Sequence, residues 1–110
     1  MTYEEIVAQA KSIYESADAS KVKEHVAIQF DIKGEGEGAF YLEIKDGKVF
    51  VEPYEYYDRD VLVTATADVL LEIVSGKLGL EKAYLTGKLR AEGNLGKALL
   101  LKEVKTKKLK

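Results

Sequence analysis

The sequence predicts an α+β domain in which helices cover one face of a sheet. Its apolar residues first follow a helical period, then alternate with a period of two through the segments between residues 26 and 66, and then return to a helical period. Runs of strands followed by runs of helices are typical of this class. With 110 residues, the chain has room for one core, and we expect a single domain over residues 1–104.

The N-terminal segment carries the start signal of a helix. Thr2 followed by Glu5 is a capping-box pattern, and apolar residues then recur at helical spacing, which predicts a helix over about residues 2–17. The polar segment that follows, residues 18–24, is expected to contain a short helical turn that starts at Ser20.

Three strands are predicted next. The first, from Val26, alternates apolar and polar residues and should be buried on one face. A GEGEG loop at 34–38 leads to a second strand, and Asp46-Gly47 is a strong signal for a type I′ hairpin turn. Such a turn sets Leu42 opposite Val51 and Ile44 opposite Val49. It leaves an aromatic pair, Tyr41 and Phe50, on the other face.

The remaining elements are predicted from caps and glycines. Residues 60–66 alternate as a strand, and Thr66 or Asp68 can cap a helix that stops at Gly76. A short helix over 80–85 and a strand over 88–92 follow, and Asn94 then caps a last helix. That helix is apolar almost all round, so protein, a partner or an apolar ligand must cover it. A compact core with no ligand remains the alternative.

Composition excludes several classes of function. A net charge of −2 provides no overall basic field for a nucleic acid, so we expect no nucleic-acid partner. The chain has no cysteine, which rules out disulfides and thiolate chemistry. The acidic N-terminus lacks the pattern of a signal peptide, so a cytoplasmic location is expected. No cofactor or metal is predicted.

The C-terminal end is rich in lysine. Residues 105–110 are expected to form a basic, disordered tail, because blocks of like charge repel one another. The tail is either merely solvated or makes weak contact with anionic membranes, where each lysine adds about 1 kcal/mol.

Two regions resemble the sterol carrier protein 2 family. AFYLEIKDGKVFV at 39–51 is similar to the family's hairpin, and residues 61–94 match in order through Asp68, Ser75-Gly76-Lys77-Leu78, Ala83, Gly87-Lys88-Leu89 and Gly93-Asn94. The resemblance implies a five-stranded, mostly antiparallel sheet with helices on one face and an apolar tunnel between them. It also implies non-enzymatic carriage of fatty acid, acyl-CoA or sterol-like lipids.

Facing direction selects the candidate tunnel walls. Those from the sheet are Phe30, Ile32, Phe40, Leu42, Val49 and Val51, and those opposite are Val69, Leu70, Ile73, Val74, Leu78, Tyr84, Leu89, Leu95 and Leu99. Each of them serves equally well as ordinary core, because cores and pockets draw on the same residue types. The tyrosines of EPYEYYDRD, residues 52–60, are a further candidate for a tunnel mouth.

Two other functions remain open. The apolar last helix and the Tyr41/Phe50 face would suit a homodimer or an accessory subunit of a lipid-metabolising assembly. An enzyme would need an acid or base such as Asp68 or Tyr84, but the sequence offers no partner that converges on either of them.

Overall fold

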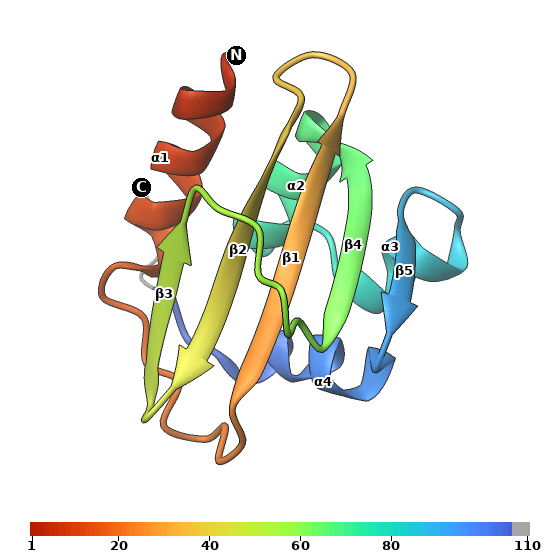
Figure 1. Ribbon diagram of the computed structural model, residues 1–110. Coiled ribbons are helices and arrows are strands. Elements are labelled where there is room, and N and C mark those ends of the chain that lie inside the picture. The colour runs from red at the N-terminus through yellow and green to blue at the C-terminus, as the bar shows by residue number, and fades with distance from the viewer. Residues whose placement is uncertain (107–110) are drawn as a thin grey trace.

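The computed structural model describes residues 1–106 of the chain, and Figure 1 shows its arrangement. The elements in chain order are α1 (Tyr3–Tyr14), β1 (Val26–Lys33), β2 (Gly38–Lys45), β3 (Lys48–Glu52), β4 (Val61–Thr66), α2 (Ala67–Val74), α3 (Leu80–Leu85), β5 (Arg90–Gly93), α4 (Leu95–Leu99) and the 3₁₀ turn η1 (Leu100–Glu103). This is the predicted order of helix, four strands, helices, strand and helix.

The five strands form one sheet in the order β3-β2-β1-β4-β5. Every neighbouring pair is antiparallel except β1 and β4, which run parallel. The helices lie together behind the sheet in Figure 1, and the segment between β3 and β4 crosses its front. The predicted α+β class, with a mostly antiparallel sheet and helices on one face, is therefore confirmed.

The hairpin has the predicted turn and register. Asp46 and Gly47 both have positive φ, 53° and 77°, as a type I′ turn requires. Leu42 pairs with Val51 and Ile44 pairs with Val49, so their side chains share the helix-covered face. The turn chemistry alone was enough to fix this register.

Helix α1 begins as predicted and ends earlier than predicted. The Thr2 side chain accepts from the Glu5 amide, and the Glu5 side chain accepts from the Thr2 amide, so the capping box is complete. The helix stops at Tyr14, three residues before the expected end. Around Ser20 the chain makes a hydrogen-bonded turn, with no helix of its own.

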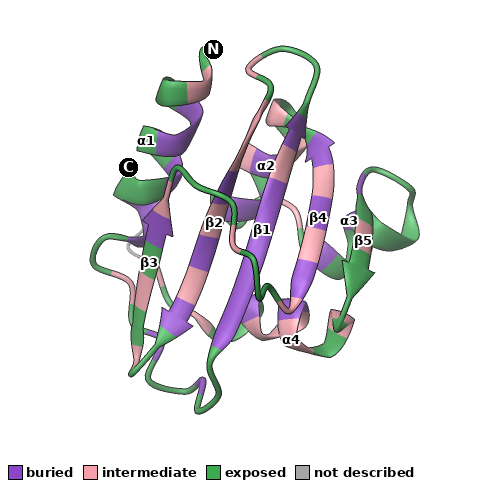
Figure 2. Ribbon diagram, viewed as in Figure 1, coloured by how far each residue is buried: buried purple, intermediate pink, exposed green. Residues whose placement is uncertain are grey.

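Strand β1 is more buried than its alternating pattern predicts. Figure 2 shows it buried along nearly its whole length, and Ala27 and Gln29 on its front face are buried too. The reason is the segment of residues 53–60, whose backbone covers the strand. The Asp60 amide donates to the Ala27 carbonyl over 2.8 Å, and the Tyr56 amide donates to the Gln29 side chain over 3.0 Å. The expectation of a strand buried on one face is therefore wrong.

Tyr41 and Phe50 share the front face as predicted, but the same segment covers Tyr41. The Tyr56 ring packs edge-on against Tyr41 with ring centroids 5.0 Å apart. Phe50 is left largely exposed on the edge strand β3. Tyr41 is thus covered from within the chain.

The C-terminal part begins as predicted and then departs from a regular helix. The Asn94 side chain accepts from the Lys97 amide over 3.2 Å, which is the expected cap. The helix tightens into η1 after Leu99. Lys105 then forms an isolated bridge with Asp18, which differs from the disordered tail expected from residue 105 onward. The rest of that tail, residues 107–110, lies outside the described residues.

Candidate ligand cavity

A partly open cavity of about 330 Å³ lies among the helices. The end of α1, the second half of α2, the loop into α3, and α4 with η1 surround it. Its lining residues are Tyr14, Ile73, Val74, Gly76, Leu78, Gly79, Leu80, Glu81, Ala98, Leu99, Leu101, Lys102, Val104 and Thr106. No strand residue is among them.

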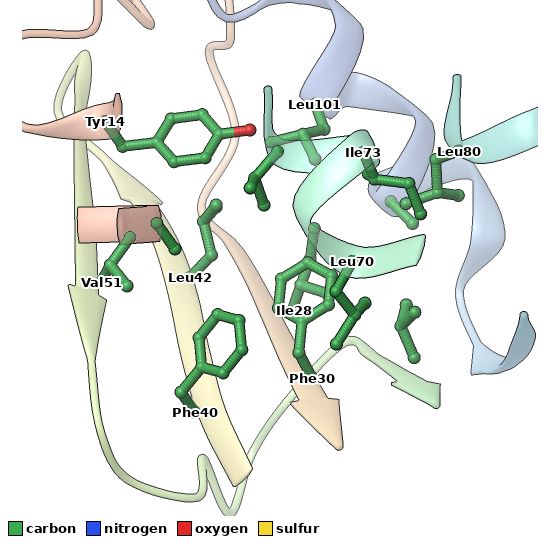
Figure 3. Packing of buried hydrophobic residues seen from close by; sticks show 14 of the residues in the cluster. Tyr14, Ile28, Phe30, Phe40, Leu42, Val51, Leu70, Ile73, Leu80 and Leu101 are labelled. Atoms are coloured by element: carbon green, nitrogen blue, oxygen red, sulfur yellow. The ribbon is translucent and has the colours of Figure 1, made fainter. Parts of the chain in front are cut away.

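The wall of this cavity is apolar inside and charged at its exposed edge. Ile73, Leu80 and Leu101 are buried around it, as Figure 3 shows, whereas Glu81 and Lys102 are exposed. A cavity of this kind favours an apolar ligand, because water inside it would find few hydrogen-bond partners.

The structure brings four of the predicted wall residues to the cavity. Ile73 and Val74 come from α2, Leu78 from the following loop, and Leu99 from α4. Seven others are buried in the core away from the cavity lining: Phe30, Ile32, Phe40, Leu42, Val51, Leu70 and Leu89. That these residues contact a ligand remains a prediction.

The other four predicted residues lie elsewhere. Val49 lines a second hollow of about 450 Å³ between the end of α1 and β3. Val69 and Leu95 are half-buried. Tyr84 is exposed on α3, so the expectation that the Tyr84 ring faces the sheet is wrong.

The space expected to form a tunnel between sheet and helices is filled by side chains. Phe30 and Phe40 stack there with centroids 5.1 Å apart, and Leu70 of α2 is buried in the same cluster (Figure 3). Aromatic rings packed at this distance leave little free volume. In this structure, the cavity that four of the predicted wall residues line lies between the helices.

Tyr14 is the cavity residue that sequence reasoning missed most clearly. It ends α1, is only 4% exposed, and lines both the cavity and the second hollow. Burial raises the pKa of its hydroxyl well above the ordinary value, so the group stays protonated. The signal was its chemistry: a tyrosine on the apolar stripe of a helix brings a hydroxyl that needs a partner.

The other lining residues outside the predicted set are Gly76, Gly79, Leu80, Glu81, Ala98, Leu101, Lys102, Val104 and Thr106. Leu101 and Val104 belong to the all-round apolar pattern of the last helix, which predicted that something must cover it. The apolar pattern could not show that this C-terminal segment itself forms one wall of the cavity.

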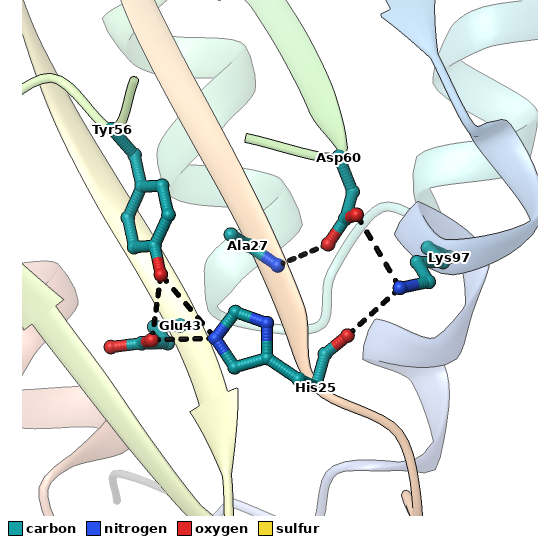
Figure 4. Close-up of polar contacts among 6 residues, drawn as sticks. All are labelled: His25, Ala27, Glu43, Tyr56, Asp60 and Lys97. Atoms are coloured by element: carbon teal, nitrogen blue, oxygen red, sulfur yellow. Dashed lines mark hydrogen bonds and ion pairs between the residues drawn. The ribbon is translucent and has the colours of Figure 1, made fainter. Parts of the chain in front are cut away.

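A polar cluster lies on the front face of the sheet, away from the cavity. His25 Nε2 and Glu43 Oε2 are 2.6 Å apart, and the Tyr56 hydroxyl donates to the same carboxylate oxygen over 2.9 Å (Figure 4). Burial of Glu43 opposes its ionisation, but the hydrogen bonds from His25 and Tyr56 outweigh it and hold the pKa of Glu43 below its usual range.

This cluster anchors the covering segment and does not form a tunnel mouth. Burial, followed by the hydrogen bond to Glu43, raises the pKa of Tyr56 to about 12. Tyr54 and Tyr57 are exposed and do not line the cavity, so the tyrosines of residues 52–60 do not have the mouth position considered for them.

A second set of contacts ties α4 to the sheet. The Lys97 ammonium donates to the His25 carbonyl over 3.0 Å and lies 3.3 Å from an oxygen of Asp60 (Figure 4). The other Asp60 oxygen accepts from the Ala27 amide over 2.8 Å. These bonds hold the helix that supplies Ala98 and Leu99 to the cavity wall.

No metal site is apparent in residues 1–106, where no group of three or more His, Cys, Asp and Glu side chains could hold an ion. In the same part of the chain, no helix has the length and apolar character needed to cross a membrane.

The fold and the cavity define a small α+β domain with space for an apolar ligand. Residues 5–105 match the model of the SCP-2 sterol transfer family. The chain belongs to this family, as its hairpin and its glycine-punctuated C-terminal half predicted.

A curated relative confirms the relationship over part of a longer protein. Hydroxysteroid dehydrogenase-like protein 2 from Mus musculus is 34% identical over 79 residues, which is 71% of this chain and 16% of that protein. The chain therefore spans only about a sixth of the length of this relative.

Solved structures share the fold over nearly the whole chain. The palmitated Sterol Carrier Protein 2 Like 2 from Aedes aegypti has a TM-score of 0.67 and 25% identity, and the match covers 94% of this chain and 93% of that one. UbiJ-SCP2, a ubiquinone synthesis protein, has a TM-score of 0.66 at 18% identity, covering 89% and 87%. The second likeness shows the fold alone.

Proposed function

We propose that this domain binds and carries lipids without catalysing a reaction, and that the cavity among the helices holds the apolar part of the ligand. The observation that supports this most directly is the cavity itself, in a chain that belongs to a sterol transfer family. The palmitated state of the Aedes aegypti relative supports an acyl chain as one class of ligand.

The size of the cavity favours one slim ligand over a lipid with two chains. Its volume of about 330 Å³ lies at the lower end of the usual range for small-molecule sites, about 300 to 1,000 Å³. Each buried methylene contributes about 0.8 kcal/mol, against an association cost of roughly 4 to 15 kcal/mol. A chain of about 15 methylenes contributes about 12 kcal/mol and can therefore reach micromolar affinity, about 8 kcal/mol, when the association cost lies at the low end of this range.

Chemical selectivity along the chain should be low. An apolar wall discriminates between ligands by length and girth, because one methylene changes binding by about 0.8 kcal/mol and no hydrogen bond is lost when one hydrocarbon replaces another. Fatty acids, the acyl part of acyl-CoA and sterol-like molecules all fit this class.

Carriage without catalysis is part of the same proposal. Asp68 and Tyr84, the acid or base candidates in the sequence, are both exposed and do not line the cavity. The cytoplasmic location expected from the sequence also stays a prediction.

Uptake of a fluorescent fatty acid by the purified chain, together with extraction of co-purified lipid, tests the proposal. Saturable uptake at one ligand per chain, with displacement by unlabelled fatty acid, is the expected result. A folded chain that neither retains lipid nor takes it up would overturn the function proposed here.

An accessory-subunit function is the second candidate. It is favoured by the likeness to the ubiquinone synthesis protein and by Phe50, an exposed aromatic residue on the edge strand β3. An open strand edge with an apolar neighbour is a ready surface for pairing with another chain. The molar mass in dilute solution distinguishes the candidates: a stable dimer without bound lipid would favour the accessory function, and a lipid-binding monomer would favour carriage.

A further inference from the structure

Tyr14 is the one buried tyrosine in residues 1–106, whereas Tyr3, Tyr41 and Tyr56 are half-buried. The Tyr3 hydroxyl donates to the Ala39 carbonyl, and the Tyr56 hydroxyl donates to Glu43. The Tyr14 hydroxyl forms no hydrogen bond with any residue in 1–106, although its side chain is the most buried of the three. The ring is buried, but no side-chain nitrogen or oxygen in residues 1–106 is both sealed from solvent and unpaired, so this hydroxyl faces open space where a ligand or water oxygen can reach it.

The position of the Tyr14 hydroxyl indicates where its partner would lie. In Figure 3 the ring extends from the end of α1 and the hydroxyl points toward Leu101, across the space that the cavity occupies. The other buried wall residues are apolar: Ile73, Val74, Leu80, Ala98 and Leu101. The hydroxyl is therefore the one polar side-chain group in the buried part of the described wall.

We propose that the Tyr14 hydroxyl makes a hydrogen bond to a neutral oxygen of the bound lipid, either a hydroxyl or a carbonyl, in the buried part of the cavity. This inference rests on the proposed function and gives the ligand its polar group and its orientation. The apolar body of the lipid then contacts the aliphatic wall.

Charge explains why a neutral oxygen fits better than a carboxylate. The charged residues lining the cavity, Glu81 and Lys102, are both exposed, so neither places a cation in its buried part. A carboxylate beside Tyr14 would lose its water without gaining a counter-ion, which is costly. Burial keeps the phenol protonated, so it can donate to a carbonyl, and it can donate to or accept from a hydroxyl.

The test compares two ligands of equal heavy-atom count, 1-dodecanol and tridecane, in wild-type protein and in Tyr14→Phe. Both compete with the neutral fluorescent probe N-phenyl-1-naphthylamine. The substitution keeps the ring and removes only the hydroxyl, so dodecanol should bind about five- to tenfold more weakly while tridecane affinity stays unchanged. Tyr3→Phe is the matched control, because its hydroxyl is already bonded and lies outside the cavity lining. This control should leave both affinities unchanged.

A folded Tyr14→Phe variant that binds dodecanol as tightly as the wild type overturns the inference and leaves lipid binding intact. Failure of the wild type to bind dodecanol, tridecane or a fatty acid overturns the proposed function as well. A measurement on the wild type does not depend on the variant folding: the ¹³Cζ resonance of Tyr14 should shift with dodecanol and stay in place with tridecane. Equal responses to the two ligands would contradict a hydrogen bond to this hydroxyl.

Discussion

Lys105 and Asp18 exchange two backbone hydrogen bonds, in which the Asp18 amide donates over 2.8 Å and the Lys105 amide over 2.9 Å. This bridge ties the end of the described chain to the loop after α1. The residues on either side of Lys105, Val104 and Thr106, both line the cavity. The bridge therefore holds one wall of the cavity in place.

Lys105→Pro should weaken this wall, because proline has no amide to donate to Asp18. Val104 is already extended, with φ −83° and ψ 126°, as a residue before proline requires. We expect a bound fluorescent fatty acid to dissociate about five- to tenfold faster, measured by transfer to acceptor vesicles. Lys105→Ala keeps the amide and should dissociate at the wild-type rate. Equal rates for the two variants would show that the bridge does not hold the wall.

Leu99→Glu should strongly weaken the binding of a fluorescent fatty acid. Leu99 is half-buried in the cavity wall, and a carboxylate there would either lose its hydration or draw water into the site. We expect affinity to fall at least about tenfold, which corresponds to about 1.4 kcal/mol.

The matched control for that substitution is Leu85→Glu, the same change at a leucine that is 74% exposed on α3 and outside the lining. It should bind like the wild type. Undiminished uptake by folded Leu99→Glu would place the ligand elsewhere.

The hairpin and most element boundaries were predictable from sequence because local chemistry fixes them. Positive φ at Asp46 and Gly47 admits one tight turn, and that turn sets the register of both strands. The caps at Thr2 and Asn94 act in the same local way. Burial of Gln29 was not predictable, because it depends on a segment about 27 residues further along the chain.

The cavity was less predictable than the fold. Phe30 and Leu99 are both apolar and both face inward, yet one fills the core and the other lines open space. Facing direction cannot separate these outcomes, since they depend on how completely neighbouring side chains meet. Tyr14 was missed because its spacing matched a core position and only its hydroxyl set it apart.

Glu43→Gln should lower the free energy of unfolding at neutral pH and make that free energy depend less on pH. A carboxyl whose pKa is lowered in the folded state stabilises the fold above its ordinary value of 4.5, and that contribution is lost as pH falls through the folded pKa. We expect a loss of about 1 to 2 kcal/mol at pH 7, measured by urea unfolding.

The loss should shrink as pH falls from about 4.5 through the lower pKa of the folded state, because the wild-type carboxyl then becomes neutral as well. Glu92→Gln, on the exposed strand β5, is the control and should change stability by less than about 0.5 kcal/mol at either pH. If Glu43→Gln lowered the free energy of unfolding equally at neutral and at acid pH, the charge of Glu43 would not stabilise the fold.

Removal of residues 107–110 should weaken adsorption to anionic vesicles. The segment carries three lysines, each worth about 1 kcal/mol near such a surface, and the effect should fade as salt screens the charges. Ending the chain at Thr106 leaves every residue of the cavity lining in place, so fatty acid affinity should not change. Vesicle co-sedimentation at low and high salt measures the first effect, and unchanged adsorption at low salt would exclude a membrane role for these residues.

The measurement that tests lipid binding in the cavity most directly is an intermolecular NOE spectrum of the methyl-labelled protein with an unlabelled long-chain fatty acid. We predict one bound ligand, with NOEs from its chain to the methyl groups of Ile73, Leu99 and Leu101, which line the cavity. A spectrum with no such contacts under saturating ligand, or with contacts confined to the front face of the sheet, would contradict a lipid site among the helices.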